Sequence, residues 1–223
     1  MKPNARLSRI EAADPVSSQT VVEAVLVQVP FEGWTKTSFA AALRQCGMTP
    51  DEAANIFPNG MRDVIEYFGA MADAAMQRRI AAERGFDRMR VRDKVAFGVR
   101  ARLEFLTPYR EALRRLMVWY ALPQNMASGV RRFYKTVDTI WIAAGDTATD
   151  YNFYTKRFLL ASVLKATTLF WLNDETSQTA ATWDFLDRRI SEVMKLGKSI
   201  SLLREFTPSE LFEAVRKKVR KVI

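Results

Sequence analysis

The sequence predicts an all-α protein, and three observations lead to this prediction. Apolar residues recur at the three-and-four spacing of amphipathic helices in successive segments of the 223-residue chain. Proline, glycine and Asn-Asp pairs separate these segments, as they do where helices end. The β-branched runs are short and never alternate cleanly with polar residues, as half-buried strands do. With 48% apolar residues, a helical chain of this length can bury a sizeable core.

The first sixty residues predict three short helices. The first is opened by the apolar residues of 21–27 and is ended by Pro30 and the glycine that follows. The second covers residues 38–45. The third begins at Thr49-Pro50-Asp51-Glu52, a capping box with proline at the first helical position, and ends at the Phe-Pro-Asn-Gly run of 57–60.

Longer helices are predicted for the rest of the chain. Helical periodicity indicates them over residues 62–84, 91–105, 108–121, 127–143, 150–172, 178–196 and 208–223. Turn residues separate them at Pro108, Pro123, Gly145-Asp146 and Asn173-Asp174.

The three short helices match the plan of a helix-turn-helix. Residues 20–68 resemble the DNA-binding domain of TetR-type regulators at Gly33-Trp34, Ser38, Ala41-Ala42, Cys46-Gly47-Met48 and Phe57-Pro58. The resemblance implies a TetR-regulator-like helical bundle, in which a larger helical domain binds a ligand and dimerises.

The charge distribution argues against DNA binding. The chain carries a net charge of +9, yet residues 1–60 hold five basic and six acidic side chains. The third helix opens with Pro50, Asp51 and Glu52, and only Asn55 could read a base. Phosphate affinity from counterion release would be lost there. We therefore predict no nucleic-acid binding, with a TetR-type transcriptional regulator as the alternative.

The absence of histidine restricts catalysis. With no His and a single Cys46, the chain has no Ser-His-Asp or Cys-His pair and no zinc site with His ligands. The pairs Asp146/Asp150 and Asp184/Asp187 are interpreted as helix caps or surface groups. The sequence therefore predicts a protein that is not an enzyme, with no catalytic residues, metal site or cofactor.

One segment carries a family resemblance. Residues 141–157 read WIAAGDTATDYNFYTKR, after Asp138-Thr139-Ile140 and before the WDFLDRR run of 183–189. This motif closely resembles the coenzyme Q protein nine family of ubiquinone-biosynthesis accessory proteins, and the resemblance extends over residues 20–223. It implies a TetR-like fold without DNA binding and a non-enzymatic carrier. Such a carrier binds isoprenoid quinone precursors and presents them to the demethoxyubiquinone hydroxylase.

The same resemblance implies a surface that docks the hydroxylase. Carried over by position, it comprises Ile140, Trp141, Asp146, Tyr151, Phe153, Tyr154 and Arg157. Phe153 stands where animal members have Trp, which keeps an aromatic anchor but removes the indole N–H donor. Without the family, aromatics beside an Arg are typical of interface hot spots, and ordinary core packing remains the alternative.

A lipid-sized pocket is predicted between the 91–121 helices and the 150–172 helix. A prenyl chain needs a long apolar cavity, which bundle helices can enclose. The predicted lining is Leu106, Leu113, Leu116, Met117, Trp119, Tyr120, Leu160, Leu164, Phe170 and Trp171. Core packing is the alternative role for each of them, and a phospholipid is the alternative occupant.

The last residues predict an amphipathic helix that begins at the Thr-Pro-Ser-Glu capping box of 207–210. A narrow apolar stripe beside a dense Lys/Arg face is typical of helices that lie in an anionic membrane surface. The predicted membrane-binding residues are Leu211, Phe212, Val215, Arg216, Lys217, Lys218, Val219, Arg220, Lys221 and Val222. Residues 197–201 are interpreted as a tether, and packing of the helix on the body is the alternative.

These observations predict four parts. They are a flexible N-terminus (1–19), a degenerate helix-turn-helix domain (20–68), a helical lipid-binding and dimerisation domain (69–206) and an amphipathic membrane-binding helix (207–223). No apolar run is long enough to span a bilayer, and no secretory signal is visible. We expect a homodimer in the cytoplasm, peripheral on the inner membrane of a bacterium, or on the matrix face if the source is eukaryotic.

Overall fold

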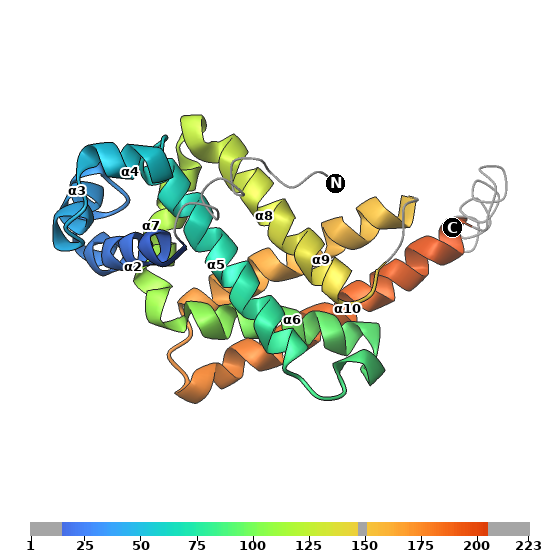
Figure 1. The fold of residues 1–223 in the computed structure, drawn as a ribbon. Coiled ribbons are helices and arrows are strands. Elements are labelled where there is room, and N and C mark those ends of the chain that lie inside the picture. The colour runs from blue at the N-terminus through green and yellow to red at the C-terminus, as the bar shows by residue number, and fades with distance from the viewer. Residues whose placement is uncertain (1–14, 147–150, 205–223) are drawn as a thin grey trace. The chain divides into compact units, whose positions relative to one another are not determined.

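The computed structural model describes residues 15–146 and 151–204, with side chains from 18 to 146 and from 155 to 195. Within these ranges the chain forms helices and connecting turns and contains no strand (Figure 1). The predicted all-α class is therefore confirmed. The chain divides into two compact units, residues 1–147 and 148–223.

The first unit begins with the three helices predicted from the sequence: α2 (Pro15–Glu32), α3 (Lys36–Gln45) and α4 (Pro50–Ile56). Helix α2 is longer than predicted, because it includes residues 15–19 and continues past Pro30. Pro30 removes one backbone donor of the helix but does not end it. The helix ends instead at Gly33, whose φ of +70° requires glycine and whose N–H donates to Val29 O over 2.9 Å.

Side-chain caps fix the starts of α3 and α4. The predicted box at Thr49 is confirmed, since Thr49 Oγ1 accepts from the Glu52 N–H and Glu52 Oε2 accepts from the Thr49 N–H. Thr35 and Ser38 form a second box that the sequence did not lead us to expect. Ser there serves the role usually given to Glu or Gln.

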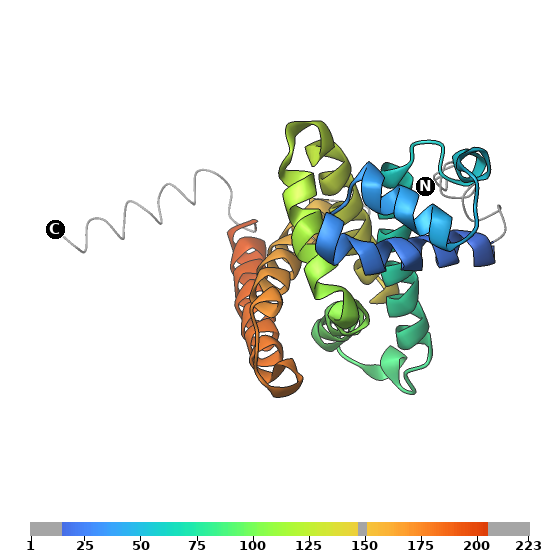
Figure 2. The ribbon, with the colours of Figure 1, turned by 90° about the vertical axis from the view of Figure 1, so that its left-hand side faces the viewer.

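The body of the first unit comprises α5 (Met61–Ala81), α6 (Val91–Leu106), α7 (Arg110–Ala121) and α8 (Pro123–Ala143), with 3-10 turns at Phe86–Arg88 and Thr107–Tyr109. Helix α5 runs through residues 68–69 without interruption. Helices α6 and α8 pack against α5, and α2 packs against α7 (Figure 2). Trp34 fastens the helix-turn-helix to this body, because its Nε1 donates to Ala112 O over 2.9 Å and its ring lies 5.7 Å from that of Phe68.

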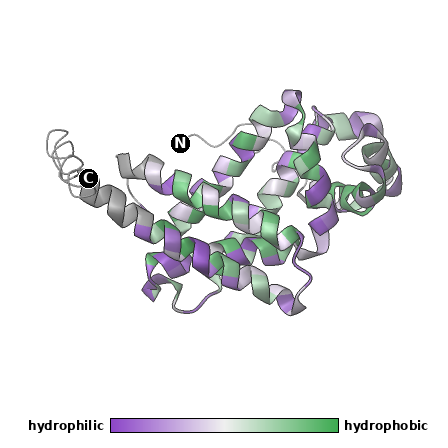
Figure 3. Ribbon diagram, turned by 180° about the vertical axis from the view of Figure 1, so that it is seen from behind, coloured by the Kyte–Doolittle hydropathy of each residue, from purple (hydrophilic) through white to green (hydrophobic). Residues whose placement is uncertain are grey.

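The second unit is a helical hairpin of α9 (Tyr151–Leu172) and α10 (Ala180–Arg204), joined through a 3-10 turn at Ser177–Thr179. The rings of Phe170 and Phe185 stack between the two helices, with centroids 4.5 Å apart. The predicted tether at residues 197–201 is wrong, because α10 continues through it to Arg204. Glycine in a helix costs about 1 kcal/mol relative to alanine, and the helix-forming residues on both sides of Gly197 offset this cost. Bands of apolar and polar residues alternate along the helices of both units (Figure 3).

Candidate functional site

Six of the predicted lipid-lining residues lie in the first unit, on α6 and α7. Leu106 and Leu116 are buried, Met117 lies at the surface, and three are partly exposed: Leu113, Trp119 and Tyr120. The buried members take the core role that was left open for them as an alternative. Their role toward a lipid stays a prediction.

The other four lie in the second unit. Leu160, Leu164 and Trp171 are buried, whereas Phe170 is 37% exposed while it stacks on Phe185. Arg189 lies over the Phe185 ring, with its Cζ 5.3 Å from the ring centroid. The hairpin therefore holds a guanidinium and two aromatic rings close together.

The predicted docking residues of the first unit lie at the end of α8. Ile140 is buried against Gly98 of α6, and Trp141 is also buried. Asp146 follows the turn that ends α8, and its N–H donates to Trp141 O. Ile142, which is not among the predicted docking residues, lies in the last turn of α8 and is 62% exposed.

The remaining docking residues lie on α9. Tyr151, Phe153 and Tyr154 occupy its first turn, and their side chains lie outside the described set. Arg157 is buried. The predicted membrane-binding residues, Leu211 to Val222, also lie outside the described residues. No helix in the part of the chain that the structure describes is long and apolar enough to cross a membrane.

A polar network that the sequence did not lead us to expect joins α5, α6 and α8. The carboxylate of Asp73 accepts from Arg102 Nε over 3.0 Å, from Thr136 Oγ1 over 3.0 Å and from Arg132 Nη2. Arg132 Nη2 also donates to Gly69 O over 2.9 Å. Asp73 and Arg132 are buried, so these bonds fix three helices at one point.

Burial sets the electrostatics of this network. It lowers the pKa of Arg102 to about 10 and lowers the pKa of Arg132 as well. Burial also raises the pKa of Tyr120, and the nearby Glu66 raises it further. The available sequence signal was weak: Asp73 stands among buried apolar positions of α5, where a charge needs a partner.

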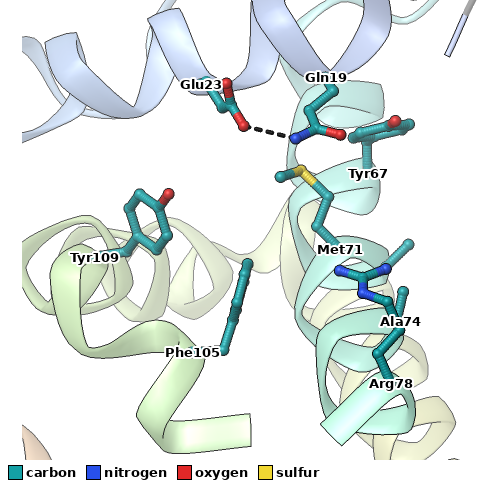
Figure 4. Close-up of a pocket in the computed structure, with 9 residues that line it drawn as sticks. Gln19, Glu23, Tyr67, Met71, Ala74, Arg78, Phe105 and Tyr109 are labelled. Atoms are coloured by element: carbon teal, nitrogen blue, oxygen red, sulfur yellow. Dashed lines mark hydrogen bonds between the residues drawn. The ribbon is translucent and has the colours of Figure 1, made fainter. Parts of the chain in front are cut away.

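A cavity of about 210 Å³ opens between α2, α5 and the end of α6 (Figure 4). Apolar and aromatic side chains form much of its wall, and Gln19, Glu23 and Arg78 supply polar groups. The full lining is Gln19, Glu23, Tyr67, Ala70, Met71, Ala74, Arg78, Phe105 and Tyr109. Gln19 Nε2 donates to Glu23 Oε1 over 2.8 Å at one end. The sequence predicted no site here, because the lining comes from three separated segments.

Comparison with known proteins gives a consistent result. Residues 126–197 match the family model named COQ9. The chain is 29% identical over 184 residues to "Ubiquinone biosynthesis protein COQ9, mitochondrial" of Drosophila melanogaster, covering 81% of this chain and 56% of that protein. The Rattus norvegicus protein of the same name is 30% identical over 183 residues, covering 79% and 58%. The chain thus spans less than three-fifths of the length of these relatives.

A solved structure shares the fold. The TetR transcriptional regulator from Nitrosomonas europaea ATCC 19718 superposes with a TM-score of 0.67 at 18% identity, covering 81% of this chain and 99% of that one. This likeness concerns the fold alone. Together these findings confirm the resemblance carried by residues 141–157: the chain is similar in sequence to the COQ9 proteins and shares the fold of a TetR-type regulator.

Proposed function

We propose that this protein is a non-enzymatic accessory protein of ubiquinone biosynthesis. It binds isoprenoid quinone precursors at the membrane and presents them to the demethoxyubiquinone hydroxylase. The observation that carries the proposal is the similarity to relatives named for ubiquinone biosynthesis. The motif at 141–157 lies inside the segment that the COQ9 model matches.

The architecture supports a carrier rather than a DNA-binding protein. In α4, Asp51, Glu52 and Asn55 are exposed, and the Glu52 carboxylate caps the start of the helix. A negative charge at that position repels phosphate. The runner-up, a TetR-type regulator with a lipid-sized effector pocket, is favoured only by the shared fold.

Docking and membrane contact belong to the same proposal. The hydroxylase docks on residues of the 141–157 motif, with Tyr154 as an anchor. The terminal helix binds an anionic membrane through Lys217, Lys218 and their neighbours. Two copies associate, and the protein is peripheral to the bacterial inner membrane or to the matrix face of a mitochondrion.

Lipid extraction tests the proposal. Purified full-length protein is extracted with organic solvent, and the extract is analysed by mass spectrometry, with a purified TetR-type regulator from the same host as the control. We expect prenylated quinone precursors in molar excess over the control. Only phospholipid or no lipid, together with tight and salt-dependent binding of operator DNA, would establish the regulator instead.

A further inference from the structure

The cavity between α2, α5 and α6 has opposite charges at its two ends. Glu23 and Gln19 lie at the α2 end, beside Tyr67 and Tyr109, whereas Arg78 lies at the opposite end (Figure 4). Among the described residues, neither Glu23 nor Arg78 has an ion-pair partner. Both side chains are exposed at the surface and also line the cavity, and the Glu23 carboxylate accepts a hydrogen bond from Gln19.

The wall between the two ends is apolar and aromatic. Tyr67, Met71, Ala74 and Arg78 succeed one another along one face of α5. At 1.5 Å per residue, the eleven steps from Tyr67 to Arg78 cover roughly 16 Å. Phe105 and Tyr109, with ring centroids 5.9 Å apart, line the opposite side. The lining on this side therefore extends along about three turns of α5.

Each part of this lining selects a chemical group. A carboxylate beside aromatic rings binds an organic ammonium through charge and cation–π attraction. A guanidinium binds a carboxylate or a phosphate, often with two hydrogen bonds. The apolar wall favours a methylene spacer between the two charges.

We propose that this cavity binds a linear zwitterion, with an ammonium at Glu23, a carboxylate or phosphate at Arg78 and an apolar spacer along α5. This site is separate from the predicted quinone pocket, and its occupancy does not depend on the function proposed above. The ligand touches α2 of the helix-turn-helix and α5 and α6 of the body at once.

Calorimetric titration of the full chain tests the site with 4-aminobutanoate, 6-aminohexanoate and 8-aminooctanoate. Hexanoate and hexylamine serve as single-charge probes. We expect affinity to depend on spacer length and to be about tenfold higher for the best zwitterion than for either single-charge probe. Equal affinity for all five compounds would overturn the proposal.

Charge-neutralising variants assign the two ends. Glu23→Gln should lower the affinity for the zwitterion to that for hexanoate, and Arg78→Gln should lower it to that for hexylamine. Glu32→Gln, on the same helix, and Arg79→Gln, next to Arg78, are matched controls outside the cavity and should bind normally. An equal loss of affinity in the two control variants would show that the zwitterion responds to the net charge of the protein and not to Glu23 and Arg78.

A second readout reports the location directly. The ¹³C-methyl resonance of Met71 should shift on addition of the best zwitterion. In Ala74→Phe, a substitution that fills the cavity from α5, this shift should disappear while the melting temperature stays near that of the unmodified chain. Persistent binding by a folded Ala74→Phe protein would place the ligand elsewhere and refute the site.

Discussion

At the scale of single residues, the buried guanidinium of Arg132 restricts its neighbours most directly at residue 69. Its side chain crosses α5 where a Cβ on residue 69 would lie 2.5 Å from Arg132 Nε. Asp73 and the Gly69 carbonyl hold the guanidinium in place, so it cannot move aside cheaply. Glycine at 69 is therefore a packing requirement that does not arise from backbone conformation.

Gly69→Ala should destabilise the protein by about 2 kcal/mol, because overpacking forces either Arg132 or α5 to shift. Denaturant unfolding of the single variant measures this loss. In an Arg132→Met background the same substitution should cost at least about 1 kcal/mol less, since no hydrogen bond holds the methionine side chain in place and it can move aside. Equal costs in the two backgrounds would show that residue 69 acts independently of Arg132.

At the scale of elements, the start of α10 depends on one carboxylate from the preceding turn. Asp174 Oδ1 accepts from the N–H and hydroxyl of Thr176, and Oδ2 accepts from those of Thr182. The same turn holds Gln178 and Thr179 at φ values of 52° and 56°. Residues other than glycine rarely adopt these φ values, so the hydrogen bonds of Asp174 offset local backbone strain.

Asp174 should make the stability of the hairpin depend on pH. Burial alone would raise its pKa, yet the four hydrogen bonds from Thr176 and Thr182 lower it from 3.8 to about 2. Because the pKa of Asp174 is lower in the folded than in the unfolded chain, its ionised carboxylate stabilises the folded state above pH 3.8. This stabilisation is lost as the pH falls from 3.8 toward 2.

Thermal unfolding of Asp174→Asn between pH 7 and pH 2 checks this expectation. At pH 7 the free energy of unfolding of the variant should be about 1–2 kcal/mol lower than that of the unmodified protein. This difference should become smaller below pH 4. Asp184→Asn, which removes an exposed carboxylate from α10, is the matched control and should show no such convergence. A deficit that stays constant down to pH 2 would contradict the assigned role of the carboxylate.

At the scale of the whole molecule, the excess of positive charge is unevenly distributed. Residues 77–115 hold twelve basic and five acidic side chains, and the stretch from 208 to 223 holds five and two. The helix-turn-helix lacks such an excess. The helix-turn-helix therefore contributes none of the excess, and the proposed membrane contact uses the part of it that the C-terminal residues carry.

The double variant Lys217→Gln, Lys218→Gln should weaken binding to anionic vesicles roughly fivefold per lysine at physiological salt. Vesicle co-sedimentation at several phosphatidylserine contents measures the effect. Arg88→Gln, Arg90→Gln removes the same net charge from exposed positions before α6 and should change binding little. An equal loss of vesicle binding in the two double variants would mean that the membrane attracts the net charge of the protein and not the C-terminal lysines in particular.

Periodicity and capping chemistry sufficed to predict most helices of this protein, because both are local. The box at Thr49 and the starts of α6 and α9 illustrate this. The bonds between Asp73, Arg102 and Arg132 could not be predicted, since partners about 30 and 60 residues apart leave no spacing in the sequence. Helix α10 extended past its prediction because one glycine does not end a helix whose neighbours favour it.

The capping box of α4 also limits what can be substituted at residue 52. The Glu52 carboxylate that disfavours DNA also accepts hydrogen bonds from the Thr49 N–H and hydroxyl, and these bonds lower its pKa. Replacing it with a basic residue would remove the repulsion and the reciprocal cap in one step. A variant built to bind DNA through α4 would therefore also carry a weaker start to that helix.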